Sequence, residues 1–246
     1  MSDQPKRIAM WSGPRSLSTV LMRAWENRHD TTVWDEPLFP PFLLMTGDNS
    51  YSEEVFAKYE TNWAKVMNQM TNEPIPDGKA IHYQKHISAF LLPDQMGMDW
   101  LAKLSNCILI REPSEMLISL FQKRPDITTF EQTGIMQLKL IFQYVYRTIG
   151  SIPPIIDARD LQQNPCRTLS LLCEAVGVEF TEAMLSWPAG SHTTDGIWAK
   201  NFYDSVEKST GFRPYKPKTN SVPDHLLGVL EQCNEIYWEL YQYRLH

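Results

Sequence analysis

Short apolar segments alternate with longer amphipathic segments along most of this chain, and this alternation restricts the fold more than any other feature. Apolar runs bounded by polar residues are typical of strands that are buried on both faces of a parallel sheet. The segments between them have the period of helices that cover such a sheet, so we predict an α/β fold with three layers, α/β/α, around a central parallel sheet. The predicted strands are Arg7–Trp11, Thr32–Trp34, Ala80–Tyr83, Cys107–Ile110 and Pro154–Ile156.

Helices are predicted where apolar residues recur with the helical period. The clearest pattern places apolar residues at i, i+3, i+4, i+7 and i+8 on one helical face: Leu17, Val20, Leu21, Ala24 and Trp25. Further helices are predicted at Glu53–Met70, Ser114–Gln122, Phe130–Ile149, Pro165–Val176 and Asp224–Tyr243. The range 187–219 is richer in Gly, Pro, Ser, Thr and Lys, so we expect a long loop there that acts as a lid or binding loop.

Length and charge restrict the number of domains and the class of partner. A chain of 246 residues suits a single α/β domain, and we predict one domain over 1–246. The formal net charge of -6 repels polyanions, so nucleic acid is not an expected partner, and any bound anion needs a local basic pocket. No apolar run approaches the roughly 20 residues that span a bilayer.

The N-terminus and the cysteines indicate a cytoplasmic protein with no membrane partner. Met1–Arg7 is polar and lacks the apolar stretch of a signal peptide. The cysteines show no pair at the spacing of a zinc finger or a redox motif, so no metal site is predicted and we interpret them as reduced core thiols. They are Cys107, Cys166, Cys173 and Cys233.

The first predicted strand leads into a turn that starts a helix, in the sequence Ser12-Gly-Pro-Arg-Ser-Leu-Ser-Thr19. A helix N-terminus offers free backbone N–H groups and a positive dipole end, which bind phosphate or sulfate. Arg15 adds a forked cation, and Ser16, Ser18 and Thr19 add hydroxyl donors. The alternative is that Ser16 only caps the helix and Arg15 is solvated.

The turn is not a nucleotide-triphosphatase loop, because the pattern Gly-x4-Gly-Lys-Ser/Thr is absent. An apolar run does end in an acid at Ile155-Ile156-Asp157, which is also the pattern of a strand end that binds Mg²⁺. A phosphotransferase or nucleotidase that uses ATP therefore remains an alternative, with Asp157 beside the Arg15 turn.

The end of the fourth strand brings in a resemblance to a known family. The segment Cys107–Phe121 places Ser119 eight positions after Arg111. Taken with the first turn, this segment resembles the sulfotransferase family, in which an Arg and a Ser at that spacing hold the 3′-phosphate of the donor. The resemblance implies a P-loop-like sulfotransferase fold and 3′-phosphoadenosine 5′-phosphosulfate (PAPS) as donor, with adenosine 3′,5′-bisphosphate (PAP) as product. A forked guanidinium and a hydroxyl suit one phosphate.

Two later segments extend the resemblance. Asp157–Leu169, followed by Gly177 and Phe180, is similar to the family's acidic-Leu, Asn-Pro, Thr-Leu and hydrophobic-Gly pattern. Near the C-terminus, Ser209–Arg213 is similar to the loop with which the family closes over the nucleotide. The resemblance therefore implies that Arg213, and with it Lys208, contacts the donor.

The catalytic base has two candidates. Lys85-His86 and the following Leu-Leu-Pro are similar to a segment of the cytosolic sulfotransferases, and this resemblance implies that His86 is the base. The family's lysine falls on Gln84, with Lys85 one place later on the other face of the strand. Glu36 is the rival base, because other members place an acidic residue after the second strand, where burial would raise its pKa.

Simpler interpretations of these residues remain open. Asp35 and Glu36 also suit a turn before Pro37, and His86 also suits a core position where its ring nitrogens have hydrogen-bond partners.

Arg15 is expected to take the place of the family's loop lysine, pairing with the 5′-phosphosulfate and stabilising the leaving phosphate.

The chain departs from the family at the turn and at the adenine site. Leu17 stands where the family turn has Gly, so we expect Gly13 and Pro14 to close the turn in a different geometry. The aromatic residues that enclose adenine in cytosolic members fall on Val20 and Ala158. Stacking on adenine is therefore left to other aromatic residues, and the candidates are Trp11, Trp198 and Phe212.

The predicted function is a transferase that moves a sulfuryl group from PAPS to a hydroxyl or amine of a small-molecule acceptor. A silent nucleotide-binding module is an alternative, since Leu17, Val20 and Ala158 depart from the family. The start Gly13–Ser18 also resembles a segment joined to aminotransferase domains in longer chains, so such a name is expected among relatives. Nothing marks the lysine of pyridoxal phosphate chemistry. The acceptor's identity and the oligomeric state stay open.

Overall fold

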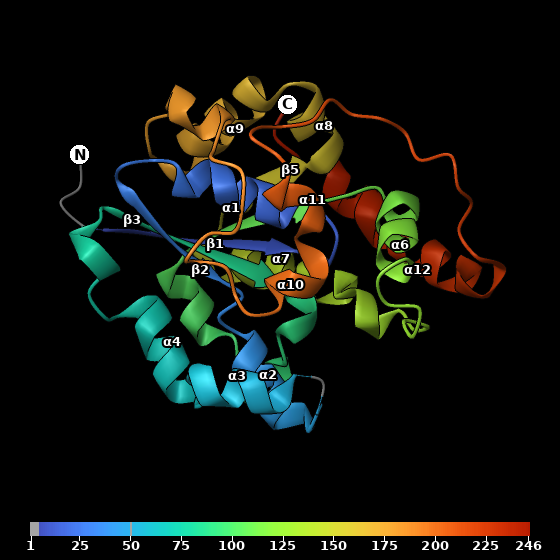
Figure 1. Ribbon diagram of the computed structural model, residues 1–246, viewed down its shortest axis with the longest axis horizontal. Helices are drawn as coiled ribbons and strands as arrows, with labels where there is room; N and C mark the ends of the chain where they lie inside the picture. The colour runs from blue at the N-terminus through green and yellow to red at the C-terminus, as the bar shows by residue number, and fades with distance from the viewer. Residues whose placement is uncertain (1–4, 50) are drawn as a thin grey trace.

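A parallel sheet of five strands forms the centre of the computed structural model, which describes residues 5–49 and 51–246 (Figure 1). The strands are β1 (Lys6–Ser12), β2 (Thr31–Asp35), β3 (Ile81–Ile87), β4 (Ser105–Ile110) and β5 (Ile155–Asp157). Their order across the sheet is β2-β3-β1-β4-β5, and each neighbouring pair is parallel. The predicted α/β/α fold with a central parallel sheet is confirmed, and every predicted strand overlaps an observed one.

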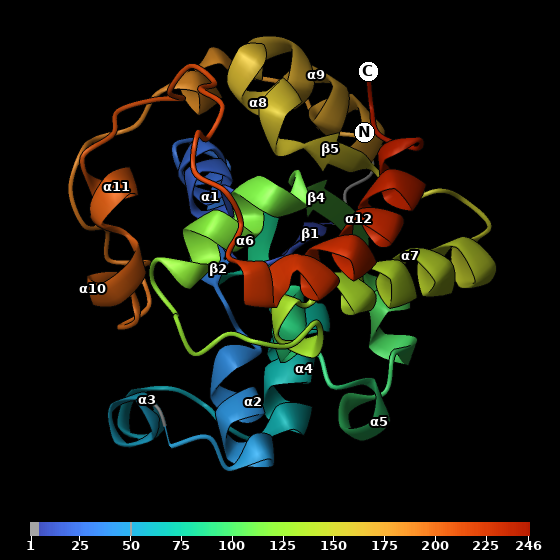
Figure 2. The same ribbon diagram turned by 90° about the vertical axis from the view of Figure 1, so that its right-hand side faces the viewer.

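Helices cover both faces of this sheet (Figures 1 and 2). One face carries α1 (Ser18–Glu26), α8 (Ala158–Gln163) and α9 (Pro165–Val176), and the other carries α4 (Trp63–Thr71), α6 (Pro113–Phe121), α7 (Ile135–Ile149) and α12 (Leu227–Tyr241). Shorter helices lie outside these layers. They are α2 (Phe39–Thr46), α3 (Ser52–Lys58), α5 (Pro93–Met96), α10 (Ala199–Phe202) and α11 (Asp204–Glu207).

Alternation along the central strand divides the apolar interior into two cores. Ile8 and Met10 of β1 pack in the core beneath α1 and α9, whereas Ala9 and Trp11 pack in the core beneath α6, α7 and α12. All four side chains are fully buried. A strand that is buried on both faces reads as a continuous apolar run, which is why the sequence identifies it.

The strand order brings the turn after β1 beside the end of β4. The chain leaves β1 toward β2 on one side of the sheet, and it leaves β4 toward β5 on the other side. Neighbouring parallel strands whose connections diverge leave a crevice at their carboxyl ends, where ligands bind in open α/β sheets. The crevice here lies between Ser12 of β1 and Ile110 of β4.

Two helix predictions differ from the structure. The predicted helix Glu53–Met70 is two helices, because Tyr59 is extended and the Asn62 side chain accepts a hydrogen bond from Lys65 N at 3.1 Å to start α4. The predicted helix Phe130–Ile149 is regular only from Ile135.

The preceding residue, Gly134, explains that late start. It is left-handed, with φ of 69°, and a Cβ there would lie 2.4 Å from the backbone nitrogen of Ala89. A side chain at this position would therefore force the chain after β3 away from the start of α7.

The remaining predictions concern the loop, the thiols and membranes. The predicted long loop at 187–219 is interrupted only by two helices of four residues each, α10 and α11. All four cysteines are free; three are buried, but Cys166 is exposed on α9, so it is not a core thiol. Within the described part of the chain, no helix combines the length and the apolar character needed to span a bilayer.

Candidate functional site

The turn between β1 and α1 holds two non-glycine residues in the left-handed region. Arg15 has φ of 60° and Leu17 has φ of 70°, whereas Gly13 is not left-handed. Pro14 lies in the turn as expected, but Gly13 does not supply the left-handed conformation, because Leu17 itself adopts it where the resemblance implies a glycine. No side chain caps α1, so the N–H groups of its first turn have no side-chain partner, which is the arrangement that suits an anion.

Arg15 meets the end of β4 in the crevice. The Nη1 of Arg111 donates to the carbonyl oxygen of Arg15 at 2.7 Å, and the Nε of Arg15 donates to the Oγ of Ser119 at 3.2 Å. The Nη1 of Arg15 also donates to the carbonyl oxygen of Phe202 at 3.1 Å. The structure thus joins three residues that the sequence predicted to share one ligand.

Positive charge at this place exceeds the negative charge that balances it. Arg111 pairs with Glu115 at 3.1 Å, while no ion pair between described residues includes Arg15. Burial, and then the charge of Arg111, lowers the pKa of Arg15. Burial also lowers the pKa of Lys218, and the charges of Arg111 and Arg15 lower it further. Such a group of cations has the chemistry of a site for a multiply charged anion.

A buried acidic and basic cluster lies at the ends of β2 and β3. The Nζ of Lys85 contacts Asp35 Oδ1 at 2.8 Å, and it also forms an ion pair with Oε1 of Glu36. The hydroxyl of Tyr203 accepts a hydrogen bond from Lys85 at 2.7 Å and donates to Asp35 Oδ2 at 2.8 Å. These four side chains are almost completely buried.

Burial and charge set the protonation of this cluster. Burial, and to a lesser degree the charge of Asp35, raises the pKa of Glu36 to about 7, although Lys85 acts in the opposite direction. Burial lowers the pKa of Lys85, but the carboxylates of Asp35 and Glu36 outweigh it and raise that pKa well above its ordinary value. Glu36 is therefore a carboxyl group that titrates near neutral pH beside a permanent cation.

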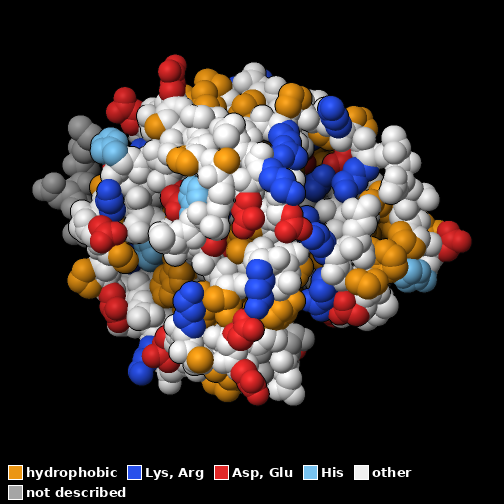
Figure 3. Space-filling view, in the orientation of Figure 1, with side chains coloured by type: hydrophobic (Ala, Val, Ile, Leu, Met, Phe, Trp, Pro, Cys, Tyr) orange, Lys and Arg blue, Asp and Glu red, His pale blue; other side chains and the backbone are white. Residues whose placement is uncertain are grey.

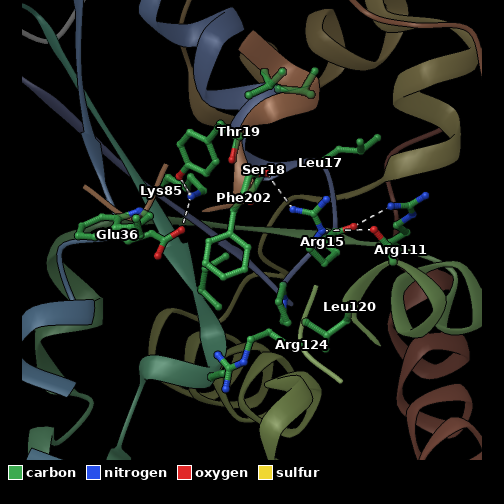
Figure 4. A pocket seen from close by; sticks show the side chains of 18 of the residues that line it. Arg15, Leu17, Ser18, Thr19, Glu36, Lys85, Arg111, Leu120, Arg124 and Phe202 are labelled. Carbon is green, nitrogen blue, oxygen red and sulfur yellow. Dashed lines mark hydrogen bonds and ion pairs between the residues drawn. The ribbon is translucent and has the colours of Figure 1, made fainter. Parts of the chain in front are cut away.

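The two clusters line one cavity of about 650 Å³ (Figures 3 and 4). Figure 4 shows Arg15 and Arg111 at one end and Lys85 with Glu36 at the other. Figure 3 shows Lys and Arg side chains gathered in a band on this face of the molecule. Apolar side chains form part of the cavity wall, and they include Phe39, Phe42, Phe90, Leu92, Ile127 and Phe202.

The backbone at Glu36 has an unusual conformation at the end of β2. Glu36 has φ of 51°, and its N–H donates to the carbonyl oxygen of Lys85 at 2.9 Å, which extends the pairing of β2 with β3. The left-handed conformation costs a residue other than glycine about 1–2 kcal/mol of conformational free energy. Residues in this conformation cluster at functional sites.

The other predicted binding residues divide between two places. Ser18, Thr19 and Arg213 line the cavity together with Arg15, Arg111 and Ser119. Gly13 and Ser16 instead border a small void on the other side of the turn. Gly13 approaches the carbonyl oxygen of Thr133, which lies 3.3 Å from where a Cβ would stand, so its role here is close packing. Lys208 is not among the described residues that line the cavity.

His86 points away from the cavity. Its ring is fully buried and stacks on Trp11, with 4.2 Å between the ring centroids, and burial lowers its pKa to about 3. The described residues that line the cavity do not include His86. The placement gives the prediction of His86 as the base no support, because a neutral ring in the core reaches no acceptor.

The lysine and the tyrosine of the buried cluster were not among the predicted catalytic residues. Lys85 lies on the other face of β3 from Gln84, as predicted, but this face reaches the cavity. The strand ends carried a signal for it, because Asp35 of β2 pairs in register with Lys85 of β3. Tyr203 carries no such signal, since it lies in the range 187–219.

Asp157 serves the fold in this structure. It caps α8 by accepting from Arg159 N at 2.7 Å, and it accepts from the hydroxyl of Tyr237 at 2.9 Å. It does not line the cavity among the described residues. Nor do the described residues contain a group of three or more His, Cys, Asp or Glu side chains placed to hold a metal ion.

Known proteins resemble this chain over most of its length. A family model for the sulfotransferase domain matches residues 6–231. The Arabidopsis thaliana protein called branched-chain-amino-acid aminotransferase-like protein 1 is 37% identical over 238 residues, which cover 95% of this chain and 41% of the relative. The chain thus spans about two fifths of that relative's length, and the predicted aminotransferase name is confirmed.

Two solved structures share the fold. The sulfotransferase domain from the curacin biosynthetic pathway has a TM-score of 0.53 at 15% identity, covering 95% of this chain and 99% of its own. The sulfotransferase from Alicyclobacillus acidocaldarius has a TM-score of 0.54 at 11% identity, covering 100% of this chain and 98% of its own. With the family model matched over nearly its whole length, the chain belongs to the sulfotransferase family.

Proposed function

We propose that this protein transfers a sulfuryl group from PAPS to a hydroxyl group of a small apolar acceptor in the cytoplasm. The observation that carries the proposal is the single cavity between the Arg15–Arg111 cluster and the Lys85–Glu36 pair. One end suits an anionic nucleotide, and the other holds a carboxyl group poised to take a proton.

The residues at the cationic end fit the donor. Arg111 and Ser119 would hold its 3′-phosphate, while Arg15 and the free N–H groups of α1 would hold the 5′-phosphosulfate. Phe212 lines the cavity and is our candidate for stacking on adenine. Trp11 is less suited, because it is buried against His86.

The carboxylate end would activate the acceptor. Glu36 accepts the proton of the acceptor's hydroxyl while the hydroxyl oxygen forms its bond to sulfur. The bond between sulfur and the bridging oxygen of the donor breaks at the same time, and its electron pair stays on the leaving phosphate. Arg15 stabilises that developing charge, so acceptor and donor become sulfate ester and PAP without a metal.

The wall beside Glu36 supports an apolar acceptor. Phe90 contacts Phe39 and Phe42, with ring centroids 4.8 Å and 4.9 Å apart, and all three rings face the cavity. A phenol or an alcohol with an apolar body buries its carbon skeleton against these rings, whereas a sugar would leave hydroxyl groups without partners.

Binding and transfer measured separately test the function. We expect PAP to raise the melting temperature with EDTA present, and a labelled sulfuryl group of PAPS to appear on phenols and amphipathic alcohols. Absence of PAP binding would contradict the donor assignment. Binding without transfer to any acceptor would make the protein a silent nucleotide-binding module, and binding of ATP only with Mg²⁺ would favour phosphotransfer.

A further inference from the structure

Asp35 is a buried carboxylate whose oxygens are surrounded by donors. It accepts from Lys85 Nζ, from the Tyr203 hydroxyl, from Trp198 Nε1 at 3.1 Å and from Gly196 N at 3.0 Å. Three of these donors belong to one stretch, 196–203, which the sequence places far from β2. With four donors, the oxygens of this buried carboxylate are not left without hydrogen-bond partners.

Glu36 stands in a different environment although it is the next residue. It shares the ammonium group of Lys85 with Asp35 and also lines the cavity. The titratable groups that face it are Asp35 at the end of β2, Lys85 of β3 and Tyr203 of the stretch 196–203. One ammonium group cannot balance two carboxylates, so the carboxylate with fewer donors is the one that takes a proton.

The geometry points to Tyr203 as a positioning residue for the proposed transfer: its hydroxyl fixes Lys85 against Asp35, and this leaves Glu36 as the carboxylate that accepts the acceptor's proton. This inference rests on the proposed function. Tyr203 would touch neither donor nor acceptor through its hydroxyl, since that group points at Lys85 and Asp35.

The stretch 196–203 has anchors that do not involve the Tyr203 hydroxyl. Ile197 N donates to the hydroxyl of Tyr59 at 3.1 Å, and the Phe202 carbonyl accepts from Arg15. The ring of Tyr203 is itself in an apolar cluster with Phe39 and Val55. Replacing Tyr203 by Phe therefore removes the polar contacts and leaves the packing in place.

The matched variants Tyr203→Phe and Tyr59→Phe separate positioning from anchoring. Each variant lacks one hydroxyl group that holds the stretch 196–203 in place, but the hydroxyl of Tyr59 contacts neither Asp35 nor Glu36. Without the Tyr203 hydroxyl, Asp35 loses a donor and its negative charge is less compensated, so the proton affinity of Glu36 rises. We expect the acid limb of kcat/KM for Tyr203→Phe to move up by about 0.5–1 pH unit, a loss of roughly 3–10-fold at about pH 6.

The pH profile of kcat/KM also shows the results that would overturn this role. At about pH 8.5 we expect Tyr203→Phe to retain kcat/KM within about twofold, and Tyr59→Phe to keep the wild-type profile throughout. Equal shifts in both variants, or no shift in Tyr203→Phe, would overturn the positioning role. A loss of activity in Tyr203→Phe that is the same at every pH would overturn it as well.

A second readout does not depend on transfer. Carbon-13 labelling of the glutamate carboxyl groups, with the Glu36 signal assigned by its loss in Glu36→Gln, reports the titration of Glu36 in the folded protein. We expect that signal to titrate at higher pH in Tyr203→Phe and unchanged in Tyr59→Phe. If the wild type transfers no sulfuryl group, the proposed function fails while this titration still decides the role of Tyr203.

Discussion

The guanidinium of Arg111 donates a hydrogen bond of 2.7 Å to the carbonyl oxygen of Arg15. This contact ties the end of β4 to the turn after β1, so the two cations that the sequence predicted for opposite ends of a nucleotide meet in one crevice. A guanidinium that is fixed by a backbone carbonyl and by Glu115 is held in place before a ligand arrives, which lowers the entropic cost of binding.

Arg111→Ala should weaken binding of PAP by about 10–100-fold, because a charged donor to phosphate contributes about 1.5–3 kcal/mol. Calorimetric titration with PAP measures this loss. Arg147→Ala, at an exposed position of α7, is the control and should bind like the wild type. An unchanged affinity in Arg111→Ala would exclude Arg111 from the phosphate site.

Transfer should increase as the pH rises through about 7, because burial raises the pKa of Glu36 to about 7 and only the deprotonated carboxylate accepts a proton. Glu36→Gln should lower kcat by about 10²–10⁴-fold while PAP still binds. The measurement is kcat/KM against pH for wild type and variant. A wild-type profile that is flat between about pH 5.5 and 8.5 would contradict this role.

Lys85→Met should destabilise the protein by about 3–5 kcal/mol, because it leaves the buried charge of Asp35 and Glu36 without a cation. The pKa of Glu36, already raised by burial, would rise further in this variant. A carboxyl group with a raised pKa destabilises the folded state more as the pH rises, so the variant should lose more stability at about pH 8 than at about pH 5. Urea denaturation at both pH values measures it. Lys139→Met breaks a more exposed pair with Glu239 and should cost less than about 1 kcal/mol at either pH.

Leu17→Gly should be more stable than Leu17→Ala by up to about 1 kcal/mol, since both remove the side chain but only glycine adopts φ of 70° without strain. Comparing the two variants cancels the lost packing of leucine. Denaturation in urea gives the difference. Greater stability of the alanine variant would mean that the turn relaxes out of the left-handed region.

The sheet could be predicted from the sequence because β1 and β4 are apolar runs, and Arg111 could be predicted because its spacing from Ser119 resembles the family. The orientation of β3 could not be predicted. All seven residues of Ile81–Ile87 are buried, and polar side chains stand on both of its faces, so alternation does not tell which face reaches the cavity. The family resemblance then favoured His86 as the catalytic base, whereas the residue of β3 that lines the cavity with a charged side chain is Lys85.

Tyr203 could not have been found from local sequence. Its partner Lys85 is 118 residues away, and the range 187–219 has no periodic pattern from which a contact could be inferred. Only the folded chain shows that Gly196, Trp198 and Tyr203 meet at Asp35.

Phe202 and Tyr203 are consecutive, and the planar peptide unit between them contains the carbonyl group that Arg15 contacts. An incoming anion that takes the Nη1 donor of Arg15 removes the partner of that carbonyl, and the rigid plane transmits the change to the tyrosine that holds Lys85. The contact of Arg15 with this backbone therefore links one end of the cavity to the buried cluster at the other end, because the same peptide plane precedes the tyrosine that holds Lys85.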